Sequence, residues 1–233
     1  MGRRTRACAG LIGALLVFAP GSGGAVWGRS VGVGPSSAGG KTALMMAAGA
    51  GDLARAQALI ASGSDVNARN SRGGTALMYA AVPGDAAMAR LLVRHGARVN
   101  LAGANGWTAL TIAAVKGHVA VVRLLLTHGA DPNQGDLYGY TPLMRAVLEQ
   151  RSEVVRALLA TGRSRVDAVD HYGATALHHA AEVGSRPLAD MLLSAGADPQ
   201  LRDRQGRTPA MLARDTGHGD LAAWLEARQP PGR

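Results

Sequence analysis

Residues 108–140 read TALTIAAVKGHVAVVRLLLTHGADPNQGDLYGY, and the fold of the chain can be inferred from this segment. Thr108 is a good helix N-cap, and the small residues after it suit a short helix that packs closely against its neighbours. Gly117 fits a left-handed turn, and the Val- and Leu-rich run that follows predicts a second helix. Gly129 fits the position just after that helix. The stretch therefore predicts two short helices followed by an extended loop.

The same pattern occurs six times along the chain. Its threonines are separated by 33, 33, 33, 34 and 33 residues, at Thr42, Thr75, Thr108, Thr141, Thr175 and Thr208. One copy cannot bury both of its helices alone, so neighbouring copies must stack on one another. The segments TALMMAA (42–48), TPLMRAV (141–147) and TALHHAA (175–181) resemble the opening of the ankyrin repeat, whose period also matches.

This resemblance implies an all-α repeat solenoid over residues 39–229, with five full repeats and a C-terminal capping repeat. Each repeat would contribute a helix-turn-helix and a finger, which is the extended loop that leads to the next threonine. We expect the repeats at about 39–71, 72–104, 105–137, 138–171, 172–204 and 205–229.

The turn between the two helices varies among the copies. Asp52, Asp85 and Ser185 directly follow the inter-helix glycine and are expected to cap the second helix. In the fourth copy Gln150 replaces that glycine, and residues 162–167 contain one extra residue. Because a left-handed non-glycine residue costs about 1 kcal/mol, we expect the fourth repeat to be the weakest joint.

The first 25 residues have the features of a secretory signal. Arg3, Arg4 and Arg6 precede an uncharged run over residues 7–19, which is shorter than the ~20 residues of a membrane span. Small residues at 23–25 predict cleavage after Ala25, and hence a periplasmic or secreted protein. Residues 26–38 are expected to be a flexible Gly/Ser-rich leader, and residues 230–233 a short tail.

Composition narrows the class of protein further. The 233 residues are 47 % hydrophobic, which is typical of a folded chain. The net charge is +9, but the sequence contains no run of five or six like charges, so no nucleic-acid-binding arm is predicted. The single cysteine, Cys8, lies in the predicted signal, so the mature chain would suit an oxidising compartment. An Arg-rich chain whose only lysines are Lys41 and Lys116 indicates a GC-rich, bacterial genome.

No catalytic motif is complete in this sequence. Residues 34–42, GPSSAGGKT, are similar to a phosphate-binding loop, but Pro35 stands where that loop needs its first glycine. The chain contains no HExxH motif and no Cys/His cluster with metal-ligand spacing. The sequence therefore predicts no catalytic residue, no metal and no cofactor.

The candidate binding positions are those that the repeat does not need for folding. The resemblance implies that a partner meets the finger tips and the exposed end of the first helix. Aromatic residues gather at these positions, as in interface hot spots. We expect the aromatic ones to form one strip, and their replacement by alanine to leave folding nearly unchanged. The candidates are Trp107, Lys116, Leu137, Tyr138, Tyr140, Glu149, His171, Tyr172 and Glu182.

The resulting prediction is a non-catalytic, monomeric protein-interaction module. It would scaffold, inhibit or protect a partner protein in the cell envelope or periplasm, without binding nucleic acid or, once the signal is removed, a membrane. Two alternatives remain open. One is a self-associating structural protein, and the other is a nucleotide-binding enzyme that uses the degenerate loop Gly34–Thr42.

Overall fold

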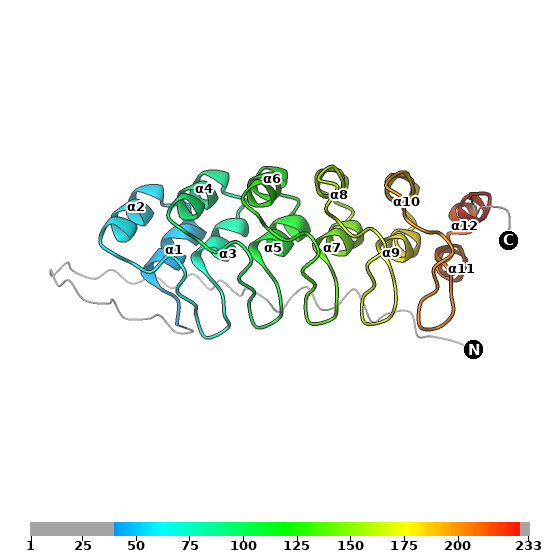
Figure 1. Cartoon of the computed structure of the whole chain (residues 1–233), viewed down its shortest axis with the longest axis horizontal. Coiled ribbons are helices and arrows are strands. Elements are labelled where there is room, and N and C mark those ends of the chain that lie inside the picture. Colours follow the sequence, from blue (N-terminus) through cyan, green and yellow to red (C-terminus); the bar gives the residue numbers. More distant parts are fainter. Residues whose placement is uncertain (1–39, 229–233) are drawn as a thin grey trace. The chain divides into compact units, whose positions relative to one another are not determined.

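The computed structural model describes residues 40–228, and they form six stacked helix pairs (Figure 1). The first helix of each pair belongs to an inner layer, which comprises α1 (Ala43–Ala50), α3 (Ala76–Ala81), α5 (Ala109–Lys116), α7 (Pro142–Leu148), α9 (Ala176–Glu182) and α11 (Pro209–Asp215). The second helices form the outer layer, which comprises α2 (Leu53–Ala61), α4 (Ala86–Arg94), α6 (Val119–Thr127), α8 (Ser152–Leu159), α10 (Arg186–Ser194) and α12 (Gly219–Glu226). The expected all-α repeat solenoid is confirmed.

Each inner helix begins at the repeated threonine. The Thr108 side chain accepts a hydrogen bond from the backbone N–H of Thr111, and the other five threonines cap their helices in the same way. The inter-helix glycines are left-handed, as at Gly117 with φ 82°. Gln150 keeps this geometry with φ 53° and is the one non-glycine residue with positive φ among residues 40–228. The turn at Gln150 is therefore left-handed, which is the condition on which the expected strain of the fourth repeat depends.

The outer helices begin in two different ways. Asp52 and Asp85 cap α2 and α4 as expected, by accepting from backbone N–H groups of the first turn. The expectation for Ser185 was wrong, because its side chain makes no capping bond to α10. Pro187 is the second residue of that helix and has no N–H to donate, so one of the two usual capping donors is missing.

Where no aspartate caps an outer helix, the side chain at the capping position can instead bind the preceding repeat. The His118 ring nitrogen Nε2 lies 3.0 Å from the carbonyl oxygen of Val82, one repeat back. Arg151 Nε donates to the carbonyl of Val115 at 3.0 Å in the same manner. A side chain at the glycine turn would obstruct this contact, since a Cβ on Gly84 would lie 2.4 Å from the His118 ring. Each turn is thus shaped by the repeat that follows it.

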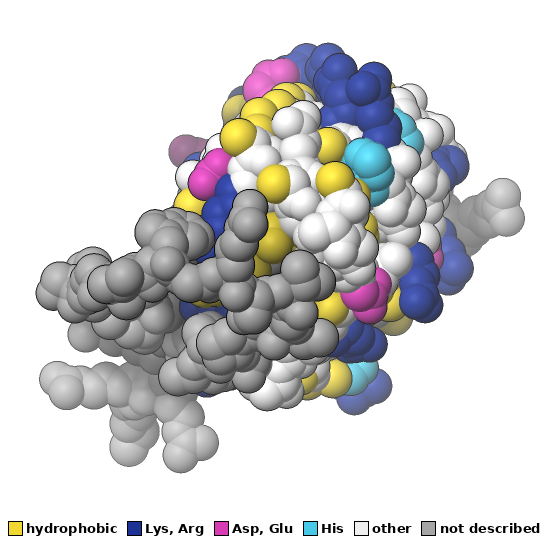
Figure 2. Space-filling model, turned by 90° about the vertical axis from the view of Figure 1, so that its left-hand side faces the viewer, with side chains coloured by type: hydrophobic (Ala, Val, Ile, Leu, Met, Phe, Trp, Pro, Cys, Tyr) yellow, Lys and Arg dark blue, Asp and Glu magenta, His cyan; other side chains and the backbone are white. Residues whose placement is uncertain are grey.

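The core lies between the layers and between successive repeats. Leu110 of α5 and Leu125 of α6 are almost completely buried, and α6 buries five side chains in all. At the first repeat, in contrast, Ala56 is the single buried residue of α2, which has a neighbouring repeat on one side only. Figure 2 views this end of the array, where apolar and uncharged atoms make up much of the visible face and arginine or lysine atoms lie near its rim. Burial therefore comes from stacking.

Candidate functional site

The fingers form a row along one edge of the array, below the inner helices in Figure 1. Neighbouring fingers are joined by backbone hydrogen bonds. The N–H of Leu137 donates to the carbonyl of Asn105 at 3.2 Å, and the N–H of His171 donates to the carbonyl of Tyr138 at 2.9 Å. The N–H of Arg204 continues the series to Tyr172 at 2.9 Å. The tips are consequently held side by side in fixed order.

A buried aspartate shapes each of the last three fingers. Asp136 Oδ1 accepts from the N–H groups of Tyr138 and Tyr140, and Asp170 Oδ1 accepts from those of Tyr172 and Ala174. Asp203 closes the last finger in the same way. In each finger the aspartate side chain accepts hydrogen bonds from backbone N–H groups that follow it, and these bonds hold the tip residues in place.

The second carboxylate oxygen of each aspartate binds a cationic or titratable side chain. Asp136 Oδ2 accepts from Arg145 of α7, with Nε at 2.9 Å, and Asp203 Oδ2 accepts from Arg207. Asp170 Oδ2 lies 2.9 Å from Nε2 of His179 on α9. Asp136 and Asp170 thereby tie their fingers to the inner helix that follows each finger, at the residue four positions after the capping threonine.

Trp107, Tyr140 and Arg145 link the third and fourth repeats. The Arg145 guanidinium lies 4.2 Å from the Tyr140 ring centroid and 5.5 Å from that of Trp107. Trp107 Nε1 donates to Asp136 Oδ2 at 3.2 Å. The Tyr140 ring in turn lies 5.2 Å from the His179 ring, which extends the contact to the fifth repeat. Such cation–π and aromatic contacts stabilise the joints between repeats.

This packing corrects part of the expected aromatic strip. Trp107 and Tyr140 are half-buried against the hydrophobic core, so they are not the structurally neutral positions that the sequence suggested. The physical reason is that Trp107 contacts Asp136 and Arg145, and Tyr140 contacts Arg145 and His179, so each ring packs against a neighbouring repeat. Tyr138 and Tyr172, in contrast, are 53 % and 62 % exposed at the tips.

His179 is buried between two carboxylates. Burial by itself would lower the pKa of His179, but its hydrogen bonds to the carboxylates of Asp170 and Glu182 outweigh burial and hold that pKa above its usual value. Burial would raise the pKa of Asp170, but His179 and the N–H of Ala174 bring it below its usual value. The His179 hydrogen bond also lowers the pKa of Glu182. A carboxylate oxygen faces each ring nitrogen of His179, and both nitrogens can donate only when the ring is protonated, so the geometry favours the cationic form.

Exposed apolar side chains concentrate on the third and fourth of the five fingers, which are the loops over residues 135–140 and 169–174. The part of the chain that the structure describes exposes six large hydrophobic residues, and four of them are Leu137, Tyr138, Val169 and Tyr172. His171 is also exposed, between the last two of these in sequence. Because the two fingers are hydrogen-bonded neighbours, these side chains share one surface. We call Leu137, Tyr138, Val169, His171 and Tyr172 the tip surface.

The three remaining candidates lie at the ends of the inner helices. Lys116 is exposed at the end of α5, whereas Glu149 and Glu182 are half-buried near the ends of α7 and α9. Glu182 contacts His179, with 3.4 Å between Oε2 and Nδ1. Sequence reasoning missed Val169 and Arg145. One signal could have identified Arg145. Several copies carry Asp or Asn five residues before the capping threonine, and this side chain binds the residue four positions after the same threonine, as Asn70 binds Tyr79.

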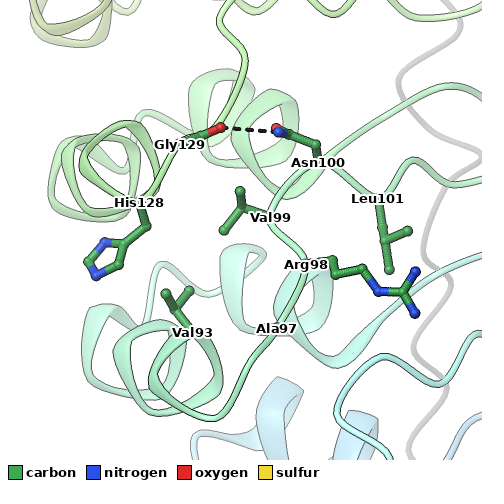
Figure 3. A pocket seen from close by; sticks show the side chains of 8 residues that line it. All are labelled: Val93, Ala97, Arg98, Val99, Asn100, Leu101, His128 and Gly129. Carbon is green, nitrogen blue, oxygen red and sulfur yellow. Dashed lines mark hydrogen bonds between the residues drawn. The ribbon is translucent and has the colours of Figure 1, made fainter.

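A hollow lies between the second and third repeats, beside the outer helices (Figure 3). Asn100 uses its amide to bind the carbonyl of Gly129 at 3.1 Å and the N–H of Asp131 at 2.8 Å. His128 Nδ1 contacts the carbonyl of Leu124. Asn67 and Asn133 make the same bonds at other joints. This hollow is therefore a feature of repeat stacking, with its amide and ring nitrogen engaged in that stacking.

The remaining sequence candidates have these outcomes. Residues 34–39 of the degenerate phosphate loop lie outside the described residues, and Thr42 caps α1. Over residues 40–228, no cluster of His, Cys, Asp or Glu side chains is arranged to hold a metal ion. In the same range, no helix is both long and apolar enough to cross a membrane. The predicted signal and leader also lie outside the described residues.

Six stacked helix pairs with a row of hydrogen-bonded fingers define a helical repeat protein. The family model described as "Ankyrin repeats (3 copies)" matches residues 29–103, 100–170, 135–203 and 163–229. The chain belongs to the ankyrin repeat family. Members of this family generally mediate protein–protein interactions and are typically non-catalytic.

Segments of the chain are also similar to parts of larger animal proteins. The chain is 42 % identical over 64 residues to diacylglycerol kinase zeta of Rattus norvegicus, which is 28 % of this chain and 7 % of the kinase. It is 46 % identical over 57 residues to diacylglycerol kinase iota of Homo sapiens, covering 24 % of this chain and 5 % of the kinase. It is 47 % identical over 62 residues to the espin-like protein of Homo sapiens, covering 26 % of this chain and 6 % of the espin-like protein. The chain thus matches only a small part of each relative.

Proposed function

We propose that this protein is a non-catalytic interaction module that binds a partner protein through the tip surface. The observation that carries the proposal is the concentration of exposed apolar residues on two adjacent fingers. Exposed tyrosines with few rotatable bonds are favoured anchors at protein interfaces. The buried Asp136 and Asp170 support them, because they hold the tyrosine backbones in place before a partner arrives.

The half-buried Trp107, Tyr140 and Arg145 form the floor beside this surface. Lys116, Glu149 and Glu182 supply charged groups at its inner-helix edge. This arrangement of an apolar centre with a polar rim is that of a protein interface. We assign recognition to the tip surface, and structural support of the tips to the floor.

We further propose that the partner lies in the cell envelope of a bacterium, where this protein would act as a scaffold, inhibitor or protector. The charged start, the short apolar run and Ala25 support export, and the arginine-rich composition supports a bacterial source. N-terminal sequencing of the protein from an envelope fraction tests this. Val26 at the N-terminus is the expected result, and an intact Met1 on cytoplasmic protein would contradict it.

The binding proposal is tested by capture from an envelope extract of the native host. Immobilised wild-type protein is compared with Tyr138→Ala/Tyr172→Ala and with Arg90→Ala/Arg123→Ala, two exposed positions on the outer helices. Loss of an anchoring aromatic commonly costs 2 kcal/mol or more, which corresponds to about 30-fold in affinity. We expect the tyrosine variant to lose a partner that both other proteins retain. Equal capture by all three would place recognition elsewhere, and a mass that rises with concentration would indicate self-association.

A further inference from the structure

The finger row carries an asymmetric distribution of charge. Its five loops cover residues 69–74, 102–107, 135–140, 169–174 and 202–207 and contain five arginines and three aspartates. The aspartates, Asp136, Asp170 and Asp203, are all less than 9 % exposed. Each is bound to two backbone N–H groups and to an arginine or histidine side chain that follows it in the chain. The row therefore presents cations to solvent and keeps its carboxylates inside.

The exposed cations lie at the two ends of the row. Arg69 and Arg72 are exposed on the first finger, and Arg202 and Arg204 are exposed on the last. The second finger carries Ala104 and Asn105 at the equivalent tip, and the next two fingers carry the tip surface. An apolar centre is thus bounded on both sides by arginines.

From this arrangement we infer that the row binds an extended protein segment with an apolar centre and acidic residues toward both ends. The inference rests on the proposed function and specifies the chemistry of the partner. Arginine binds carboxylates well because its fork of N–H donors matches their geometry. Opposite charge at the rim also speeds association and excludes basic segments.

The length of the segment follows from the spacing of the repeats. Packed helices lie about 10 Å apart, so the four steps from the finger of Arg72 to that of Arg204 span about 40 Å. An extended chain rises ~3.3 Å per residue, so ~12 residues would cover the row. Apolar side chains would contact Tyr138 and Tyr172 near the middle of such a segment, with carboxylates at its ends.

A single-stranded nucleic acid fits the row less well. It carries a phosphate at every unit and is held by a positive groove along its whole length. In this row the central fingers carry aliphatic Leu137 and Val169 beside the tyrosines, and no arginine or lysine stands in loops 102–107, 135–140 or 169–174. Because the arginines of the row stand only on its first and last fingers, the row favours a protein segment with acidic residues at its two ends over a uniformly charged nucleic acid.

The test selects random peptides of ~12 residues displayed on phage against the immobilised full chain. The charge variant is Arg72→Glu/Arg204→Glu. Its matched control is Arg90→Glu/Arg123→Glu on α4 and α6, which changes the net charge equally at exposed outer-helix positions. We expect the wild type and the control to select peptides with acidic ends and an apolar centre. The charge variant should lose that preference.

Synthetic versions of the selected peptides are then measured by fluorescence anisotropy. We expect Arg72→Glu/Arg204→Glu to weaken binding about tenfold at low salt, with a smaller difference when salt screens the charges. The control should bind as the wild type does. Circular dichroism checks that all variants remain folded.

Each other outcome has a definite meaning. Peptides that depend on Tyr138 and Tyr172 but show no acidic preference would overturn this inference and leave the proposed function intact. Peptides that bind independently of these tyrosines, or no selection at all, would contradict both. Tighter binding of an oligothymidylate of ~12 nucleotides than of the selected peptides would identify the row as a nucleic-acid site and overturn the inference.

Discussion

At the scale of single residues, Gln150 shows how the repeat constrains sequence. Five copies place glycine at this turn, and all five are left-handed with φ between 68° and 89°. Gln150 adopts φ 53° in the same place because the following helix must still turn back onto the outer layer. A side chain in this region of backbone space costs about 1 kcal/mol. The fourth repeat therefore contains a local strain that the others lack.

Replacing Gln150 with glycine should relieve this strain. We expect Gln150→Gly to raise the free energy of unfolding by about 1 kcal/mol, as measured by urea denaturation. The matched control is Glu149→Gly, one residue earlier, where φ is −86°. There glycine brings no relief and should lower stability. A lower midpoint for Gln150→Gly would show that the glutamine side chain stabilises the turn.

His179 gives the protein a pH dependence of defined sign. Its pKa is raised on folding, so its contribution to stability is complete below its ordinary pKa of 6.5 and is lost as the pH rises through the folded-state value. We expect His179→Gln to destabilise the protein more near pH 6 than near pH 8.5. Unfolding measurements at several pH values, all kept above the range in which carboxylates titrate, would test this.

His178 is the internal control for that experiment. Burial lowers its pKa, and it accepts from the N–H of Thr175 while its other nitrogen contacts the carbonyl of Arg207. The neutral His178 therefore loses its contribution to stability as the pH falls below 6.5, whereas His179 loses its contribution as the pH rises. NMR titration should place the pKa of His179 above that value and the pKa of His178 below it. The reverse order would contradict the assigned cation.

At the scale of elements, each finger and the inner helix that follows it act as a unit. Asn70 with Tyr79, Asp136 with Arg145, and Asp170 with His179 are the same contact made with different chemistry. The contact holds the tip of the finger in place, so the identity of the exposed tip residues can vary without loss of the finger's conformation. Support and recognition are thus separated within a single loop.

Alanine substitutions should reveal this separation. We expect Trp107→Ala and Tyr140→Ala each to cost about 1–3 kcal/mol of stability, below the 3–5 kcal/mol of a fully buried large aromatic residue, because both are half-buried. Tyr138→Ala and Tyr172→Ala should stay within about 0.5 kcal/mol of the wild type, as exposed positions usually do. Denaturant unfolding of the four variants distinguishes the pairs. Equal stability in all four would mean that the Arg145 contacts contribute little.

The sequence predicts local geometry better than it predicts the contacts between repeats. Thr108, Gly117 and Gln150 could be assigned because capping and left-handed turns depend on near neighbours in the chain. The residue type of Ser185 alone misleads, because Pro187 removes one of the two N–H groups that a capping side chain binds. The half-burial of Trp107 and Tyr140 was not foreseen, since it depends on Arg145 and on the neighbouring repeat. The division of the candidate site into floor and tip therefore required the structure.

At the scale of the whole array, stability is shared between neighbouring repeats while binding is confined to a few fingers. Leu125 is completely buried in α6 between the adjacent outer helices α4 and α8. We expect Leu125→Ala to lower the free energy of unfolding by about 2–5 kcal/mol. Partner capture should persist below the new melting temperature, because the tip surface lies on different elements. Loss of capture by folded Leu125→Ala protein would show that the two roles are coupled.

The most direct test of partner binding at the tip surface is site-specific photo-cross-linking in the native host. A photoreactive phenylalanine analogue replaces either Tyr172, on the fourth finger, or Arg123, on the outer helix α6. Both positions are exposed, so the analogue should be tolerated at each. We expect irradiation to produce a discrete adduct from position 172 and none from position 123. An adduct that forms from position 123 alone would place the partner on the outer helices and contradict recognition by the finger tips.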